Sequence, residues 1–158
     1  MTYGRRIALL MVSIFATASA ATVRGEADFR AVHSDSMPGV VDLGSMVTNG
    51  DVRSFSMYMR EGADIPGNTV RARALINCRD RTERIAAVAK QNVAGTGFDA
   101  AETVNEPLGK ADTDPTGTLI VNLVCAKPAD RDRYSPRLSA HDWRDALAAS
   151  NDEGRYAP

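Results

Sequence analysis

The chain contains few of the residues that usually carry catalysis or bind metals. Among its 158 residues there are only two histidines and two cysteines. The histidines, His33 and His141, stand far apart in the sequence, whereas a zinc site needs clustered His and Cys ligands. Histidine is also the usual base for nucleophilic catalysis. The sequence therefore predicts no catalytic residue, no metal site and no cofactor, and we expect a protein that is not an enzyme.

Long apolar runs are missing as well, except for one near the N-terminus. Arg5 and Arg6 precede an apolar run at residues 7–16, and residues 18–20 (ASA) match the small-x-small pattern of a signal peptidase site. This order predicts a cleaved signal peptide at residues 1–20. A membrane anchor or a buried helix is the alternative, but the run is too short to span a bilayer comfortably. We expect export to the periplasm or the extracellular space, with no membrane span after cleavage.

A strong excess of either charge is also absent. Loss of Arg5 and Arg6 from the 19 basic residues leaves 17 against 20 acidic ones, a net charge of −3. This balance gives no global attraction to nucleic acid or to an anionic membrane. Residues 21–127 are long enough for one domain with a single core. Residues 128–158 are charged and poor in apolar side chains, which predicts a mobile C-terminal tail, with a possible short helix capped by Ser139.

Both cysteines, Cys78 and Cys125, lie in the part that would be exported. Paired thiols persist in oxidising compartments, so we expect a disulfide, with a free reactive thiol as the alternative. In the chain-entropy model such a crosslink stabilises the fold by about 4 kcal/mol. That is a large share of the stability of a small domain, and only 6% of the whole chain is aromatic.

Alternation of apolar and polar residues predicts a hairpin over residues 40–60. Val41, Leu43 and Val47 share one face of its first half, as in a half-buried strand. The dipeptide Asn49-Gly50 favours a type I′ turn, because both positions tolerate positive φ. The segment that follows alternates in the same way, which completes the hairpin.

Other segments are less clear. Residues 28–33 are short enough for an edge strand, and residues 69–78 alternate as a strand. Residues 81–93 fit a helical stripe but also a strand. In residues 116–126 the β-branched side chains favour a strand, whereas Asp114-Pro115 is a typical helix start. The residues alone leave both of these alternatives open.

The strand at residues 69–78 has two different faces. One face is small and apolar and includes Cys78, while Arg71, Arg73 and Arg79 share the other and Arg81 follows closely. Arginine forks suit carboxylate, sulfate or phosphate, so these four arginines are the candidate ligand-binding residues. The plainer interpretation, favoured by how common exposed charges are, is a solvated face whose arginines pair with neighbouring acidic residues.

Several of these features occur in a recognisable order. The first strand carries V-V-D-x-x-S (Val40, Val41, Asp42, Ser45), a later strand ends in N-C-R-D-R at residues 77–81, and an apolar segment ends in V-C-A at residues 124–126. Residues 40–127 thereby resemble the surface-adhesin protein E-like domain of bacterial exported proteins. The resemblance implies an antiparallel β-sheet meander with a C-terminal helix tethered by the disulfide. It makes residues 116–125 the helix and residues 82–93 a strand.

The resemblance also implies a function. We expect an exported, non-enzymatic, adhesin-like binding module at the bacterial surface or in the periplasm, with an unknown protein or an acidic glycan as partner. The alternative is a periplasmic accessory or envelope-assembly protein that acts through protein–protein contacts. One departure bears on the adhesive role: the family commonly has a tryptophan in the loop before the last helix, and residues 107–115 contain none.

Overall fold

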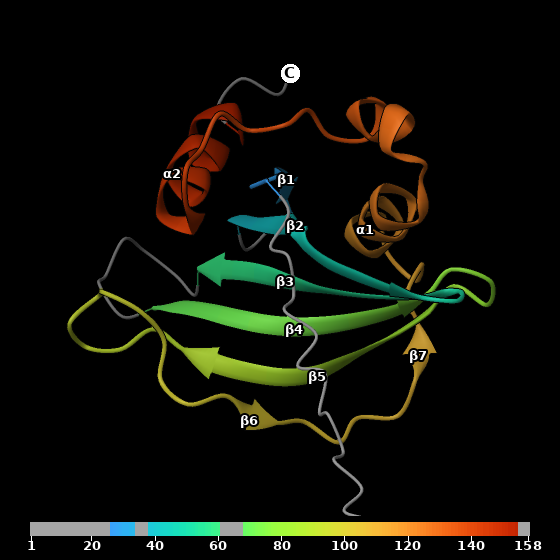
Figure 1. Cartoon of the computed structure of the whole chain (residues 1–158), viewed down its shortest axis with the longest axis horizontal. Coiled ribbons are helices and arrows are strands. Elements are labelled where there is room, and N and C mark those ends of the chain that lie inside the picture. Colours follow the sequence, from blue (N-terminus) through green and yellow to red (C-terminus); the bar gives the residue numbers. More distant parts are fainter. Residues whose placement is uncertain (1–25, 34–37, 61–67, 155–158) are drawn as a thin grey trace, which may run out of the picture.

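The computed structural model describes residues 26–33, 38–60 and 68–154, so the predicted signal peptide lies outside the described residues. An antiparallel sheet with the strand order β1-β2-β3-β4-β5-β6 forms the centre of the fold (Figure 1). Its strands are β1 (Phe29–His33), β2 (Pro38–Asn49), β3 (Val52–Arg60), β4 (Thr69–Asn77), β5 (Thr82–Lys90) and β6 (Glu102–Thr103), and β7 (Gly109–Lys110) also pairs with β5. Helix α1 (Pro115–Cys125), the 3₁₀ helix η1 (Pro128–Arg133) and helix α2 (Trp143–Gly154) follow.

The predicted α+β meander is confirmed. The hairpin of residues 40–60 forms from β2 and β3 around Gly50, whose φ of 57° suits the tight turn. The segment that fitted either a helix or a strand is strand β5, and β1 lies at the sheet edge.

The segment that follows Asp114-Pro115 is helix α1, as the resemblance implied. The Asp114 carboxylate accepts a hydrogen bond of 2.8 Å from the backbone N–H of Gly117, and Pro115 occupies the first turn. Capping and packing thus override the strand preference of its β-branched residues.

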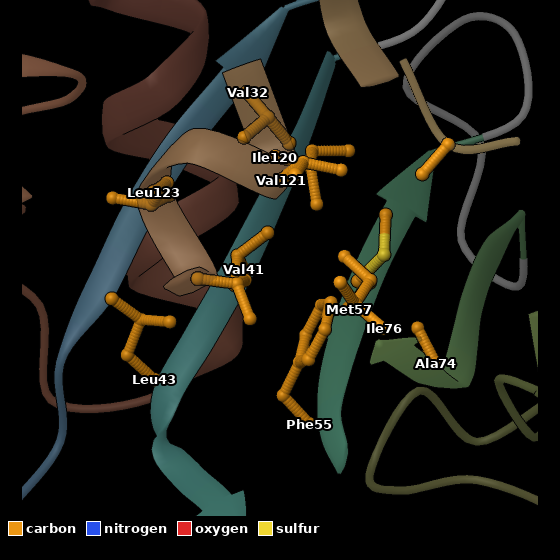
Figure 2. Packing of buried hydrophobic residues seen from close by; sticks show 12 residues of the cluster. Val32, Val41, Leu43, Phe55, Met57, Ala74, Ile76, Ile120, Val121 and Leu123 are labelled. Atoms are coloured by element: carbon orange, nitrogen blue, oxygen red, sulfur yellow. The ribbon is translucent and has the colours of Figure 1, made fainter. Parts of the chain in front are cut away.

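Each helix covers a different face of the sheet, because alternate residues along a strand point to opposite sides. Figure 1 shows α1 and α2 on either side of β1 and β2. Beneath α1 lies the larger core, which Figure 2 shows in part; it includes Val41, Phe55, Ile76, Val121 and Leu123. The smaller core on the α2 face contains Phe29, Val40, Tyr58, Leu138, Ala146 and Leu147.

The disulfide between Cys78 and Cys125 is present and joins the residue after β4 to the last residue of α1. Their Cα atoms are 5.6 Å apart although 47 positions separate them in the sequence. The start of the helix is held just as closely. A Cβ atom at Gly117 would lie 2.0 Å from the carbonyl oxygen of Ala111, so only glycine fits there. Helix α1 is therefore fixed to the rest of the fold near both of its ends.

The prediction of a mobile tail is wrong for residues 128–150, which pack against the sheet. Leu138 donates its backbone N–H to the carbonyl of Phe29, at the outer edge of β1, and Leu147 is completely buried. The cap of α2 is Asp142 and not the predicted Ser139. The Asp142 carboxylate accepts hydrogen bonds from the backbone N–H groups of Arg144 and Asp145. This packing was not visible in the sequence, because the segment contains only a few apolar residues and they pack against strands that are distant in the chain.

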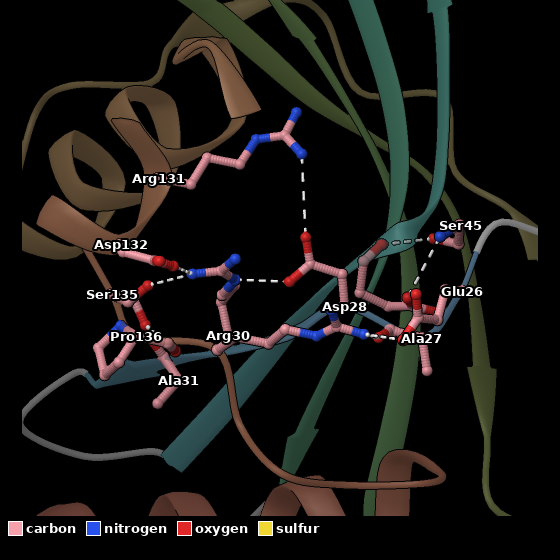
Figure 3. Close-up of polar contacts among 12 residues, drawn as sticks. Glu26, Ala27, Asp28, Arg30, Ala31, Ser45, Arg131, Asp132, Ser135 and Pro136 are labelled. Atoms are coloured by element: carbon pink, nitrogen blue, oxygen red, sulfur yellow. Dashed lines mark hydrogen bonds and ion pairs between the residues drawn. The ribbon is translucent and has the colours of Figure 1, made fainter. Parts of the chain in front are cut away.

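A buried arginine fixes η1 to β1 (Figure 3). Arg30 is only 5% exposed, and its guanidinium donates to Asp28 at 2.6 Å, to the carbonyl of Ser135 at 2.7 Å and to the carboxylate of Asp132. Burial alone would lower the pKa of Arg30, but the bonds to the two carboxylates outweigh it and raise the pKa above its usual value. This network therefore holds a charged side chain inside the fold.

Candidate ligand-binding groove

A groove of about 740 Å³ lies on the α2 face of the sheet, where β3, β4 and β5 form its floor. Among the described residues, helix α2 packs mainly over β1, β2 and β3, away from the β5 side of this face. The small side chains of Ala87 and Ala101 line the groove and leave room above the strands. Its volume falls in the range of about 300–1,000 Å³ that is typical of small-ligand sites.

Two of the four predicted arginines lie in the floor of this groove. Arg71 stands opposite Tyr58 of β3, and Arg73 stands opposite Ser56. The Arg71 guanidinium lies 4.9 Å from the ring centroid of Phe98, and the Arg73 Nε donates a hydrogen bond of 2.7 Å to a serine hydroxyl in β3. Neither side chain forms an ion pair with a carboxylate of the described residues. Within the described part of the chain, both can therefore take up an anion without first breaking an ion pair.

An aromatic cluster forms the wall beside α2. Tyr58 and Trp143 are stacked, with 5.8 Å between ring centroids and 8° between ring planes, and Phe98 lies 4.9 Å from Trp143. The Arg144 guanidinium covers Trp143 at 4.4 Å and also donates to the carbonyl of Gly95 at 2.8 Å. The wall is thus held in one arrangement by contacts on several sides.

The opposite wall is a bulge in β2. Asp42 pairs with Ser56 while Val47 pairs with Ser54, so β2 has extra residues at this point. The Ser45 hydroxyl donates to the Asp42 carbonyl at 2.7 Å and accepts from the Ser56 N–H at 2.8 Å, which closes the bulge. The Asp42 and Ser45 of the V-V-D-x-x-S motif therefore build this wall.

The bulge also corrects one sequence prediction. Val47 was expected on the buried face with Val41 and Leu43, which are buried, but Val47 is 43% exposed and lines the groove. The extra residues are odd in number, so they reverse the alternation and turn Val47 to the other face.

Polar groups of both signs stand around the arginines. Asp42 lines the groove from β2, while His141 and Asp142 line it at the start of α2. Burial would raise the pKa of Asp142, but the N–H groups of Asp145 and Arg144 and the Arg144 side chain bind its carboxylate and lower the pKa. This side of the groove therefore offers an ionised carboxylate, an acceptor of hydrogen bonds.

The other two predicted arginines do not join the groove. Both follow the last residue of β4, so the alternation that would align them with Arg71 ends before it reaches them. Arg79 pairs with Asp51 at 2.8 Å and is well exposed. Arg81 has a φ of 53° and donates to Asp112 at 2.8 Å. These two arginines fit the plainer interpretation of paired charges.

The segment that contains these two arginines, the N-C-R-D-R motif at residues 77–81, forms a turn. The Asn77 side-chain oxygen accepts the N–H of Arg79 at 3.0 Å, and the side-chain nitrogen donates to Asp80 at 3.0 Å. The side chain of Arg81 also donates to Asn122 of α1 at 3.2 Å, and its carbonyl accepts the N–H of Ala111. The motif thereby positions Cys78 and the loop before α1.

Reasoning from sequence missed the walls of the groove, which come from residues far apart in the chain. The V-V-D-x-x-S motif, which the resemblance had singled out, contains Asp42, and it was the sequence signal that pointed to one of these walls.

In the described ranges, no group of three or more His, Cys, Asp or Glu side chains is placed to hold a metal ion. No helix within these same ranges has the length and apolar character needed to cross a membrane.

No protein-family model, curated protein or solved structure matches the chain. The structure defines its class as an α+β protein with an antiparallel meander and a helix linked by a disulfide. Kinship with surface-adhesin protein E-like domains stays a prediction that rests on the residues of the motifs.

Proposed function

We propose that this protein is an exported, non-enzymatic, adhesin-like binding module that holds an acidic ligand in the groove over β3–β5. The observation that carries the proposal is the position of Arg71 and Arg73, two guanidinium groups in one groove without an ion pair to any described carboxylate. Planar guanidinium forks bind carboxylate, sulfate and phosphate groups in two-pronged fashion. The aromatic wall next to them is already fixed, so its side chains add contact area and lose little conformational entropy when a ligand binds.

The disulfide supports the exported location. A bond between Cys78 and Cys125 persists in a non-reducing compartment such as the periplasm or the cell exterior. The predicted signal peptide at residues 1–20 would supply the route.

Binding to acidic polymers tests the groove. Immobilised polygalacturonate, heparin and poly-L-glutamate are offered to the chain without residues 1–20, over a range of salt concentrations. We expect binding to at least one of them that weakens with salt and that Arg71→Gln/Arg73→Gln abolishes. The equally charged control Arg79→Gln/Arg84→Gln should retain binding, because Arg84 of β5 is exposed and neither residue lines the groove. Binding to none of the three, or equal loss in both double variants, would contradict the proposal.

Location separates the adhesin-like role from the alternative of a periplasmic accessory protein. Protease treatment of intact cells should degrade a surface-exposed adhesin-like module and spare a protein confined to the periplasm. Crosslinking in the native envelope then identifies the partner. Recovery of envelope-assembly proteins through Arg71-independent contacts would favour the accessory role.

A further inference from the structure

We infer that the ligand of the groove carries a dianionic phosphate monoester, whose terminal oxygens rest on Arg71 and Arg73. The inference rests on the proposed function and narrows the acidic group of its ligand to one chemical class. It is carried by a surplus of hydrogen-bond donors and of positive charge on the floor of the groove.

The donors on the floor have almost no acceptors, although each guanidinium carries five N–H groups. In the described part of the chain the Arg71 side chain donates to no acceptor, and its contact with Phe98 is of the cation–π kind. Arg73 uses only its Nε, which donates to Ser54. Ser56 stands opposite Arg73 and adds a hydroxyl group to the floor. A ligand that fits this floor therefore supplies several acceptor oxygens close together.

The carboxylates that line the groove are already bound elsewhere. Asp142 accepts the backbone N–H of Arg144 and pairs with the side chain of the same arginine at 3.2 Å. Asp42 accepts the backbone N–H of Ser45 at 3.2 Å, and it stands two strands away from Arg73, roughly 10 Å between Cα atoms. The floor thus favours a dianion, because a single negative charge would leave one of its two guanidinium groups without a counter-charge.

Geometry separates a phosphate monoester from other acidic groups. Arg71 and Arg73 lie two residues apart on one strand face, roughly 7 Å between Cα atoms, so both forks can approach a single group from below. A phosphate monoester directs three terminal oxygens toward the floor while its ester bond points out of the groove. A carboxylate has two oxygens and one charge, and a sulfate ester has three oxygens but also one charge. Of these three groups, only the phosphate monoester combines three oxygens with two charges.

The size of the groove bears on the molecule that carries the phosphate. A groove of about 740 Å³ encloses a small ligand, while a protein partner usually needs about 800 Å² of contact on each side. The carrier is therefore a phosphorylated small molecule or the headgroup of a lipid, which present the same chemical group.

Three ligands with one scaffold test the inference by calorimetry on the chain without residues 1–20. Glucose 6-phosphate, glucose 6-sulfate and glucuronate carry an acidic group at position 6 of the same sugar. At pH 7.5 we expect the phosphate to bind at least tenfold more tightly than each of the other two. Arg71→Gln/Arg73→Gln should lose the phosphate, and Arg79→Gln/Arg84→Gln should keep it. Equal affinity for the phosphate and either of the other ligands would overturn the inference.

The pH dependence gives a second readout of the dianion. A phosphate monoester passes from dianion to monoanion with a pKa of about 6, whereas a sulfate ester keeps its single charge. The titratable groups that line the groove, Asp42, Tyr58, His141 and Asp142, act on both ligands in the same direction. The ratio of the phosphate to the sulfate affinity should therefore fall about fivefold or more from pH 7.5 to pH 5.0, in the wild-type protein and in His141→Gln. A constant ratio would contradict the dianion.

Vesicles distinguish the two carriers. Phosphatidylcholine vesicles contain either phosphatidic acid, a monoester, or phosphatidylglycerol, a diester with one charge. Stronger retention on phosphatidic acid that requires Arg71 and Arg73 supports a lipid carrier, whereas binding of glucose 6-phosphate without this preference supports a small molecule. If neither phosphate monoester binds but heparin or poly-L-glutamate binds through Arg71 and Arg73, the inference fails while the proposed function stands. If no acidic polymer binds either, both fail.

Discussion

The Ser45 hydroxyl accepts a hydrogen bond of 2.8 Å from the backbone N–H of Ser56. This bond fastens the bulge of β2 to its neighbour β3 at the edge of the groove. The same hydroxyl donates to the carbonyl of Asp42, so one side chain bonds two backbone groups at the bulge.

Replacement of Ser45 by alanine should destabilise the protein by about 1–3 kcal/mol, because it leaves a partly buried N–H group unsatisfied. The free energy of unfolding in urea measures this. Ser139→Ala is the control, since Ser139 is exposed and does not cap α2, and it should change stability by less than about 0.5 kcal/mol. Equal stability of both variants would mean that the bulge does not need the hydroxyl.

Gly117→Ala should destabilise the fold by about 1–3 kcal/mol, because the added methyl group would lie 2.0 Å from the carbonyl oxygen of Ala111. The loop before α1 must move to relieve this overlap. Gly109→Ala is the matched control, since nothing lies within 4 Å of a Cβ at that position. Thermal unfolding of the two variants separates a steric effect from a general effect of alanine.

Leu147→Ala should cost about 2–5 kcal/mol of stability, because Leu147 is completely buried between α2 and the sheet. Leu108→Ala makes the same chemical change at a side chain that is 60% exposed and should cost less than about 0.5 kcal/mol. A small effect of Leu147→Ala would restore the expectation of a mobile tail. Urea unfolding of both variants provides the comparison.

The disulfide should contribute about 4 kcal/mol, the value of the chain-entropy model for a separation of 47 residues. Cys78→Ala/Cys125→Ala should lower stability by about this amount. Dithiothreitol should lower the unfolding midpoint of the wild-type protein but not that of the double variant. An unchanged midpoint for the reduced wild-type protein would contradict this account, as would two free thiols in the mass spectrum of the exported product.

The pairing of Arg81 with Asp112 should be visible as a pH dependence. The hydrogen bond from Arg81 is the main cause that lowers the pKa of Asp112 below its ordinary value of 3.8. The pair therefore stabilises the folded state above that pH, and its contribution is lost as the pH falls through the lower, folded-state pKa. In Arg81→Gln the carboxyl resonance of Asp112 should titrate closer to 3.8, whereas Arg79→Gln should leave it unchanged.

The parts of the fold that depend on local pattern could be predicted. The hairpin of residues 40–60 follows from alternation and an Asn-Gly turn, both of which lie within one short stretch of sequence. Helix α1 could not be derived from its residues, because Asp114-Pro115 and the β-branched side chains point to different structures. It took a resemblance to choose between them, and the contact of Gly117 with Ala111 shows how tertiary packing decides such a conflict.

The groove could be predicted only in part. The alternation of β4 correctly places Arg71 and Arg73 on one face. The same reasoning was wrongly extended to Arg79 and Arg81, which lie beyond the end of the strand, where alternation no longer assigns residues to a face. The walls depend on a bulge that reverses the alternation and on Trp143, which reaches the sheet only because a distant segment folds back. No local pattern in one sequence contains such long-range contacts.

A titration followed by nuclear magnetic resonance tests the central claim most directly. With isotope-labelled protein and glucose 6-phosphate, we expect shifts of the Arg71 and Arg73 side-chain Nε–H signals and of the Trp143 indole N–H, all of which belong to groove residues. Shifts confined to Arg79, Arg81 and their turn, or no shift with any acidic polymer, would contradict the assignment of ligand binding to this groove.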